Sequence, residues 1–229
     1  MAQSIGGIFG KVTGNIGNYT VRVVRGKTII SARPKHYNAS NSPKSIETRQ
    51  NFAVTSAFTH AVWGLSMLHE IWEMNKGTIA TAYNAILKYN LSLSSAKAPT
   101  LNNIITPPFG FQTPVIESSI SENKLTGSLV ELNTDKRISN FENDLSINAV
   151  VCLSGPKEES EPFYKIFSLS KEVAGFEFGL PYDFEINLDT ENAALVAKYT
   201  QKIIYLAVAT KSQDNKLIRY SRSYSKMSN

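Results

Sequence analysis

The stretch Lys202-Ile-Ile-Tyr-Leu-Ala-Val-Ala-Thr210 is followed by Ser212-Gln-Asp-Asn215 and then by Leu217-Ile-Arg-Tyr-Ser-Arg-Ser-Tyr224. The outer two pieces are rich in strand-forming residues and the middle piece consists of turn formers, which predicts a β-hairpin. Similar runs recur upstream, and the expected strands are 119–130, 145–153, 163–168, 174–178, 182–188, 194–210 and 216–225. About seven strands in roughly 120 residues is the spacing of an immunoglobulin-like antiparallel β-sandwich, which we predict over residues 106–229.

The region before the sandwich has a helical period. Ser42 followed by Pro43 is a typical helix start, and apolar residues recur from there to Trp72 in steps of three and four. Lys76-Gly77 predicts a helix end, and a second helix is expected over residues 79–90. The short break predicts an antiparallel helical hairpin over residues 41–94, followed by a linker at 95–105.

The first forty residues form a basic, glycine-rich arm. Two β-branched runs flank Arg25-Gly-Lys27, and a glycine in so short a connection predicts a β-hairpin. A lone hairpin is at best marginally stable in water, so the arm is expected to pack on the rest of the chain or on another subunit. The predicted fold class is therefore α+β: an N-terminal hairpin arm, a helical hairpin and an immunoglobulin-like sandwich.

Positive charge is concentrated in the same region. Residues 1–50 carry eight basic side chains and one acidic side chain, a balance of +7, whereas the other 179 residues have a balance of −2. Such asymmetry predicts an acidic partner, either nucleic acid or the acidic surface of a protein. The candidate binding residues of the arm are Lys11, Arg22, Arg25, Lys27, Arg33 and Lys35. Tyr19 and Tyr37 could add stacking on bases.

Motifs for catalysis, metals and nucleotides are weak. Gly10-Lys-Val-Thr-Gly-Asn-Ile-Gly17 lacks the terminal Gly-Lys-Ser/Thr of a phosphate-binding loop and precedes a strand. His69-Glu70 has no second histidine at metalloprotease spacing, and no histidine follows it that could activate a nucleophile. The single Cys152 excludes an intramolecular disulfide and is expected to be buried. We therefore predict a protein that is not an enzyme and has no cofactor, metal or small-molecule substrate.

The N-terminus and the hydropathy of the sequence bear on where the protein is located. The N-terminus has no cationic start before an apolar stretch, and no window is long and apolar enough to span a membrane. The expected location is the cytoplasm or a virion, without membrane contact.

An alternative function is carbohydrate binding by a platform of aromatic residues, Phe176, Phe178, Tyr182 and Phe184. Alternating aromatic residues in strands, however, more often belong to a core.

Several motifs occur in a fixed order along the first ninety residues. They are Phe9-Gly-Lys-Val-Thr-Gly-Asn-Ile-Gly17, Arg25-Gly-Lys27, Arg33-Pro-Lys35, Ser45-Ile-Glu-Thr-Arg-Gln-Asn-Phe52 and Thr81-Ala-Tyr-Asn-Ala-Ile-Leu-Lys-Tyr-Asn-Leu91. This order resembles a family of uncharacterised Bacteroidota proteins of about this length. The resemblance covers residues 5–91, and the C-terminal half only in outline. It implies the fold and the lack of catalysis but gives no mechanism.

These observations predict a structural or assembly protein. We expect it to be a subunit of a large particle, for example a phage head or tail, that docks through its basic arm onto other copies of itself or other subunits. The alternative is a nucleic-acid-binding protein that uses the same arm.

Overall fold

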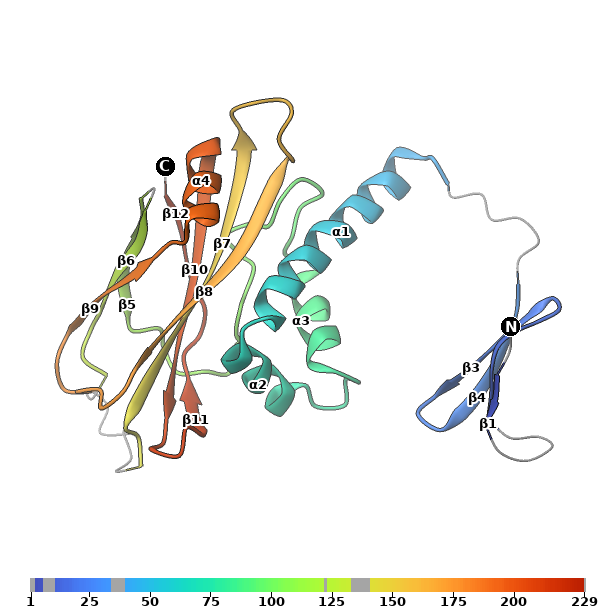
Figure 1. The fold of residues 1–229 in the computed structure, drawn as a ribbon, viewed down its shortest axis with the longest axis horizontal. Helices are drawn as coiled ribbons and strands as arrows, with labels where there is room; N and C mark the ends of the chain where they lie inside the picture. The colour runs from blue at the N-terminus through green and yellow to red at the C-terminus, as the bar shows by residue number, and fades with distance from the viewer. Residues whose placement is uncertain (1–2, 6–10, 34–39, 122, 133–140, 229) are drawn as a thin grey trace. The chain divides into compact units, whose positions relative to one another are not determined.

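The computed structural model describes residues 3–5, 11–33, 40–121, 123–132 and 141–228, and it divides the chain into two compact units, Met1–Ser42 and Pro43–Asn229 (Figure 1). The chain contains helices and antiparallel strands, and the strands are arranged in several sheets. This confirms the predicted α+β class. The unit boundaries differ from the predicted domains, because the predicted helical segment from residue 43 onward and the segment 106–229 belong to one unit.

The N-terminal unit is a four-stranded antiparallel sheet. Its strands are β1 (Gln3–Ile5), β2 (Lys11–Ile16), β3 (Tyr19–Val24) and β4 (Lys27–Ala32), paired in chain order. Arg25 and Gly26 connect β3 to β4 with φ angles of 51° and 74°, as a type I′ turn requires. The expected hairpin is therefore present as β3–β4, but the glycine-punctuated segment before it adds two further strands.

Three helices begin the larger unit: α1 (Pro43–Trp63), α2 (Ser66–Asn75) and α3 (Ala82–Asn90). The expected two-helix hairpin is wrong in this respect, because the first predicted helix ends at Trp63 and restarts at Ser66, after Gly64. Thr81 caps α3 by accepting a hydrogen bond from the Asn84 amide. In the described part of the chain, no helix combines the length and the hydropathy needed to cross a membrane.

A large antiparallel sheet lies at the centre of this unit. Its strands are β7 (Asp144–Pro156), β8 (Tyr164–Val173), β10 (Tyr199–Lys211), β11 (Leu217–Tyr220) and β12 (Tyr224–Ser228). The order is β11-β10-β7-β8, and β12 also pairs with β10. The predicted C-terminal hairpin is confirmed as β10–β11, with Lys211 opposite Leu217.

A second, smaller sheet contains β5 (Val115–Ile120), β6 (Lys124–Leu129) and β9 (Tyr182–Asn187) in the order β5-β6-β9. The expected strand 119–130 is thus the end of one strand and all of the next, separated by a turn. Residues 174–178 form turns and irregular backbone rather than the expected strand. Residues 194–198 belong to helix α4 (Thr190–Lys198), which Asp189 caps through the amide of Asn192.

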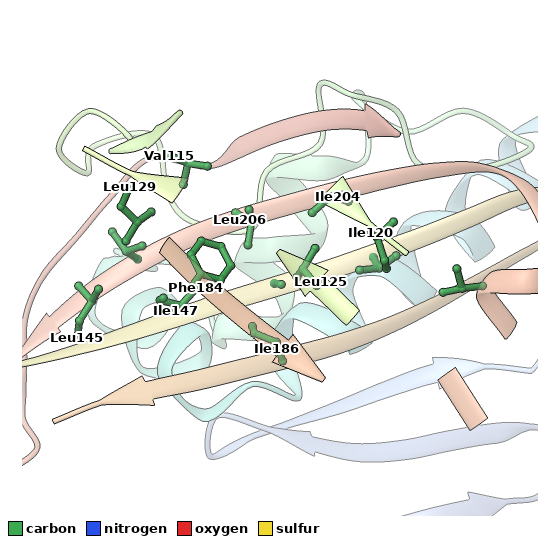
Figure 2. Packing of buried hydrophobic residues seen from close by; sticks show 14 of the residues in the cluster. Val115, Ile120, Leu125, Leu129, Leu145, Ile147, Phe184, Ile186, Ile204 and Leu206 are labelled. Carbon is green, nitrogen blue, oxygen red and sulfur yellow. The ribbon is translucent and has the colours of Figure 1, made fainter. Parts of the chain in front are cut away.

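The central strands of the large sheet, β7 and β10, are buried on both faces. Because side chains alternate along a strand, Ile204, Leu206 and Val208 of β10 pack toward the small sheet, as Figure 2 shows for the first two. Ile203, Tyr205, Ala207 and Ala209 of the same strand pack with the helices. The larger unit therefore has three layers: helices, large sheet and small sheet. The expected free-standing sandwich did not include the helical layer.

The predicted linker at 95–105 is a packed loop. Trp72 donates its indole N–H to the Ile105 carbonyl at 2.8 Å, and the Tyr205 hydroxyl donates to the Thr100 carbonyl at 2.6 Å. Asn90 and Asn103, both buried, hydrogen-bond to each other at 3.0 Å. These bonds satisfy polar groups of the loop against α2, α3 and the large sheet, so the loop joins two layers of one unit.

Candidate docking interface

The structure describes the side chains of four of the six predicted binding residues of the arm. Arg22 lies on β3, Arg25 in the turn, Lys27 at the start of β4 and Arg33 directly after β4. Lys11 begins β2, and Lys35 and Tyr37 lie outside the described residues. The register pairs Val24 with Lys27 and Arg22 with Ile29, so Arg22 and Lys27 are on the same face of the sheet.

The register gives the sheet two different faces. We call the first the basic face; its described residues are Asn15, Thr20, Arg22, Val24, Lys27, Ile29 and Ser31. Hydrogen bonds along it join Thr20 to Asn15 and Ser31 to the Thr20 carbonyl. We call the second the apolar face; its described residues are Gly14, Ile16, Tyr19, Val21, Val23, Thr28, Ile30 and Ala32. Arg22 and Lys27, the charged strand residues whose side chains are described, thus lie opposite the apolar face.

The charges of the N-terminal unit are not neutralised within it. Residues 1–42 contain six basic residues and no aspartate or glutamate, so all 19 acidic residues lie in 43–229. Among the described residues, the side chains of Arg22, Arg25, Lys27 and Arg33 take part in no salt bridge. Four uncompensated cations on about thirty residues favour an acidic or strongly hydrated environment.

The apolar face is largely open. Among the described side chains of this unit, Val21 alone is buried. Its neighbours on the face are exposed: Ile30 to 65%, Tyr19 to 54% and Ile16 to 48%. A sheet of this size gains stability by covering one face. Within the described part of the N-terminal unit, no other element lies on the apolar face.

Exposed apolar side chains also occur where the larger unit begins. In α1, Ile46 is 38% and Phe52 50% exposed, and burial of the helix starts only at Val54. The apolar period from Ser42 to Trp72 predicts that Ile46 belongs to the apolar stripe of this helix. It is exposed because the first turns of α1 extend beyond the other helices, as Figure 1 shows.

A polar cleft in the larger unit was missed by the sequence reasoning. It has a volume of about 540 Å³ and is lined by Glu70, Asp144, Glu172 and Lys211, among others. Lys211 is 5% exposed and forms a salt bridge with Glu172, whose other oxygen accepts a hydrogen bond from Ser146 at 2.6 Å. Because the Glu172 carboxylate holds its ammonium group, we interpret Lys211 as a structural residue. No local sequence signal connects residues so far apart in the chain.

The aromatic residues proposed as a carbohydrate platform belong to the core. Phe176, Phe178 and Phe184 are at most 8% exposed and pack in the cluster between the sheets. Phe176 makes edge-to-face contacts with Phe178 and Tyr182 at 5.0 and 5.3 Å between ring centroids. The three phenylalanine rings are therefore part of the core, and the four residues form no shared exposed platform.

Cys152 lies in the core on the helical side of the large sheet. Burial raises the pKa of its thiol to about 12, so the reactive thiolate is scarce at neutral pH. No cluster of three histidine, cysteine, aspartate or glutamate residues suited to a metal ion occurs within the described ranges.

Comparisons with known proteins provide no family. No family model matches the sequence, and no curated protein does. Among solved structures, the selenomethionine-labelled beta-glucosidase from Kluyveromyces marxianus is 12% identical with a TM-score of 0.22, and its complex with glucose is 11% identical with a TM-score of 0.21. Each match covers 62% of this chain and 17% of the glucosidase. A likeness at these TM-scores supports no conclusion about fold or activity.

Proposed function

We propose that this chain is a non-enzymatic structural protein, a subunit of a larger assembly that docks through its N-terminal sheet. The observation that carries the proposal is the contrast in burial within one chain. Residues 43–229 have two well-packed cores, whereas Val21 is the one buried side chain described in the N-terminal sheet. A stable subunit body with a poorly covered sheet on a separate unit is an arrangement suited to contact with a neighbour.

The other parts of the proposal rest on the sequence. The absence of catalysis follows from the three scattered histidines, His36, His60 and His69, and from the lack of a nucleophile motif. A particle such as a phage head or tail is the kind of assembly in which such arms are useful. The predicted immunoglobulin-like character of residues 106–229 fits a body that is displayed outward, and two antiparallel sheets over a shared core are compatible with it.

Native mass spectrometry and sedimentation of the full chain and of residues 43–229 test this function. We expect the full chain to associate as its concentration rises and the truncated chain to stay monomeric. Circular dichroism and thermal melting must show that the truncated chain is folded. A full chain that is monomeric at every concentration up to the millimolar range would contradict the proposal.

The second candidate function is binding of nucleic acid by the basic face. Arg22, Lys27 and the turn residue Arg25 favour it, because their charges are free of internal partners in the described structure. If all seven net charges of residues 1–50 met phosphates, the logarithm of the binding constant would fall with the logarithm of salt concentration with a slope of about −6. A slope near zero would exclude this candidate.

A further inference from the structure

We propose that the occupant of the apolar face is the same face of a second copy of the chain, so that two N-terminal sheets pack face to face. This inference rests on the proposed function and names the partner of its docking site. The proposal uses only the register of β2, β3 and β4 and the exposure of the side chains that the register brings together.

Charge decides which face can meet a second copy. The described residues of the apolar face carry no charge, whereas Arg22 and Lys27 lie on the opposite face. Two basic faces brought together would place like charges within a few ångströms, which is unfavourable without an acidic group in residues 1–42 to separate them. With the apolar faces inward, the same cations point outward on both sides of the pair. A second copy is therefore accepted in one orientation.

The relief of the apolar face suits packing against itself. Across the strands, one row reads Ile16, Tyr19, Ala32, and the next reads Gly14, Val21, Ile30. Large side chains thus lie beside two small residues, Gly14 without a Cβ atom and Ala32 with a methyl group, which leave shallow depressions in the face. Packed sheets interdigitate across a separation of about 10 Å. The projecting Ile30 and Tyr19 of one copy can fill the depressions of the other.

The size of the face sets the strength of the contact. The three strands β2, β3 and β4, each six residues long, give a face on the order of 300 Å² at about 4.8 Å between strands and about 3.3 Å per residue. Two such faces bury on the order of 600 Å², below the roughly 1,200 Å² of a stable, specific interface. One pair of sheets should therefore bind weakly and reversibly. In an assembly with many copies, avidity makes such weak contacts effective.

Neighbouring residues on β4 provide a matched test. Ile30 and Ile29 are the same residue type on the same strand, but Ile30 is 65% exposed on the apolar face and Ile29 is 38% exposed on the basic face. We would compare Ile30→Lys with Ile29→Lys in the full chain by sedimentation velocity over a series of protein concentrations. Ile30→Lys should weaken self-association by about 100-fold, because a charge replaces a side chain buried twice in a symmetric pair. Ile29→Lys should change it by less than about threefold.

Further variants and conditions separate the outcomes. Ile30→Val, which keeps the apolar surface and the strand preference, should associate as the unchanged chain does. Association should also persist at high salt, since apolar contacts are not screened. If truncation to 43–229 abolishes association but both lysine variants associate normally, the face-to-face pair is wrong and the assembly function stands. If both variants lose association equally, the contact is not specific to the apolar face and the inference also fails.

Packing of the apolar face on the same chain is the remaining alternative. It would make Ile30→Lys lower the free energy of unfolding of the larger unit, measured in urea by the fluorescence of Trp63 and Trp72. A decrease larger than that caused by Ile29→Lys would overturn the proposal. A full chain that shows no self-association at all would remove both this inference and the proposed function.

Discussion

The N-terminal sheet and the large sheet obey the same alternation but differ in what covers them. In β10 both sets of alternating side chains are buried, one against the helices and the other against the small sheet. In β3 and β4 the apolar set has a similar composition, yet Tyr19 and Ile30 are more than half exposed. The difference shows that strand pattern alone does not make a stable layer. A second surface is needed, and the larger unit contains its own, whereas residues 3–5 and 11–33 of the N-terminal unit provide none.

Truncation of one aliphatic side chain in each sheet should give the largest contrast. Leu206 is fully buried between the two sheets of the larger unit, and Leu206→Ala should lower its free energy of unfolding by about 2–5 kcal/mol. Ile30→Ala should leave that free energy within about 0.5 kcal/mol of the unchanged value. Urea unfolding of dilute protein, followed by tryptophan fluorescence, measures both. Equal losses would show that the apolar face of the N-terminal sheet is already covered in the monomer.

The chain also offers a buried and an exposed tyrosine for comparison. Tyr205 is fully buried, donates a hydrogen bond to the Thr100 carbonyl and packs edge to face on Phe58, whereas Tyr19 is 54% exposed. Tyr205→Phe should lower the free energy of unfolding by about 1–2 kcal/mol at neutral pH, because the carbonyl loses its partner. Tyr19→Phe should have no measurable effect on the same transition.

The two tyrosine variants should also differ in alkali. Burial, with a smaller contribution from Cys152, raises the pKa of Tyr205. A phenol whose folded pKa lies above its unfolded value of about 10 stabilises the fold fully below that value and loses this contribution as pH rises above it. The stability of the unchanged protein should therefore fall more steeply above about pH 10 than that of Tyr205→Phe. Parallel pH profiles for the two proteins would show that the phenol is not buried as described.

Two turn glycines give the smallest contrast. Gly26 and Gly175 have φ angles of 74° and 60°, and a Cβ atom at either position would meet nothing within 4 Å. Substitution by alanine therefore introduces backbone strain of about 1 kcal/mol without a clash. Gly175→Ala should lower the free energy of unfolding of the larger unit by that amount. Gly26→Ala should leave the tryptophan-detected transition unchanged, because its strain lies in the other unit. A loss with Gly26→Ala would show that the two units unfold together.

The strand and helix patterns predicted much of the fold because they are local. The turn at Arg25-Gly26 and the hairpin after Lys211 depend on a few adjacent residues, and both are present as expected. The packing of the helices on the large sheet could not be predicted from such local patterns. The contact of Val150 and Tyr205 with the helices depends on which face of the large sheet the helices cover, and no local pattern encodes this.

The candidate interface was predicted only in part for a similar reason. Its charge was visible in the sequence, since residues 1–42 contain no acidic side chain. Its separation into two faces follows from the register of β3 and β4, in which Val21 pairs with Ile30 and Arg22 with Ile29, and β2 extends both faces. Without that register, Arg22 and Ile30 could not be assigned to opposite sides. Alternation along residues 19–24 already separates Tyr19, Val21 and Val23 from Arg22. The exposure of the apolar face could not be read from the sequence.

Hydrogen–deuterium exchange of the full chain, measured at low and at high protein concentration, tests the central claim most directly. The claim is that the N-terminal sheet lacks a core of its own and gains one by association. The amides of Val21 and Val23 should exchange much faster than those of Tyr205 and Leu206 in dilute protein, and should become protected as the chain associates. Protection of Val21 and Val23 equal to that of β10 at every concentration would contradict the account.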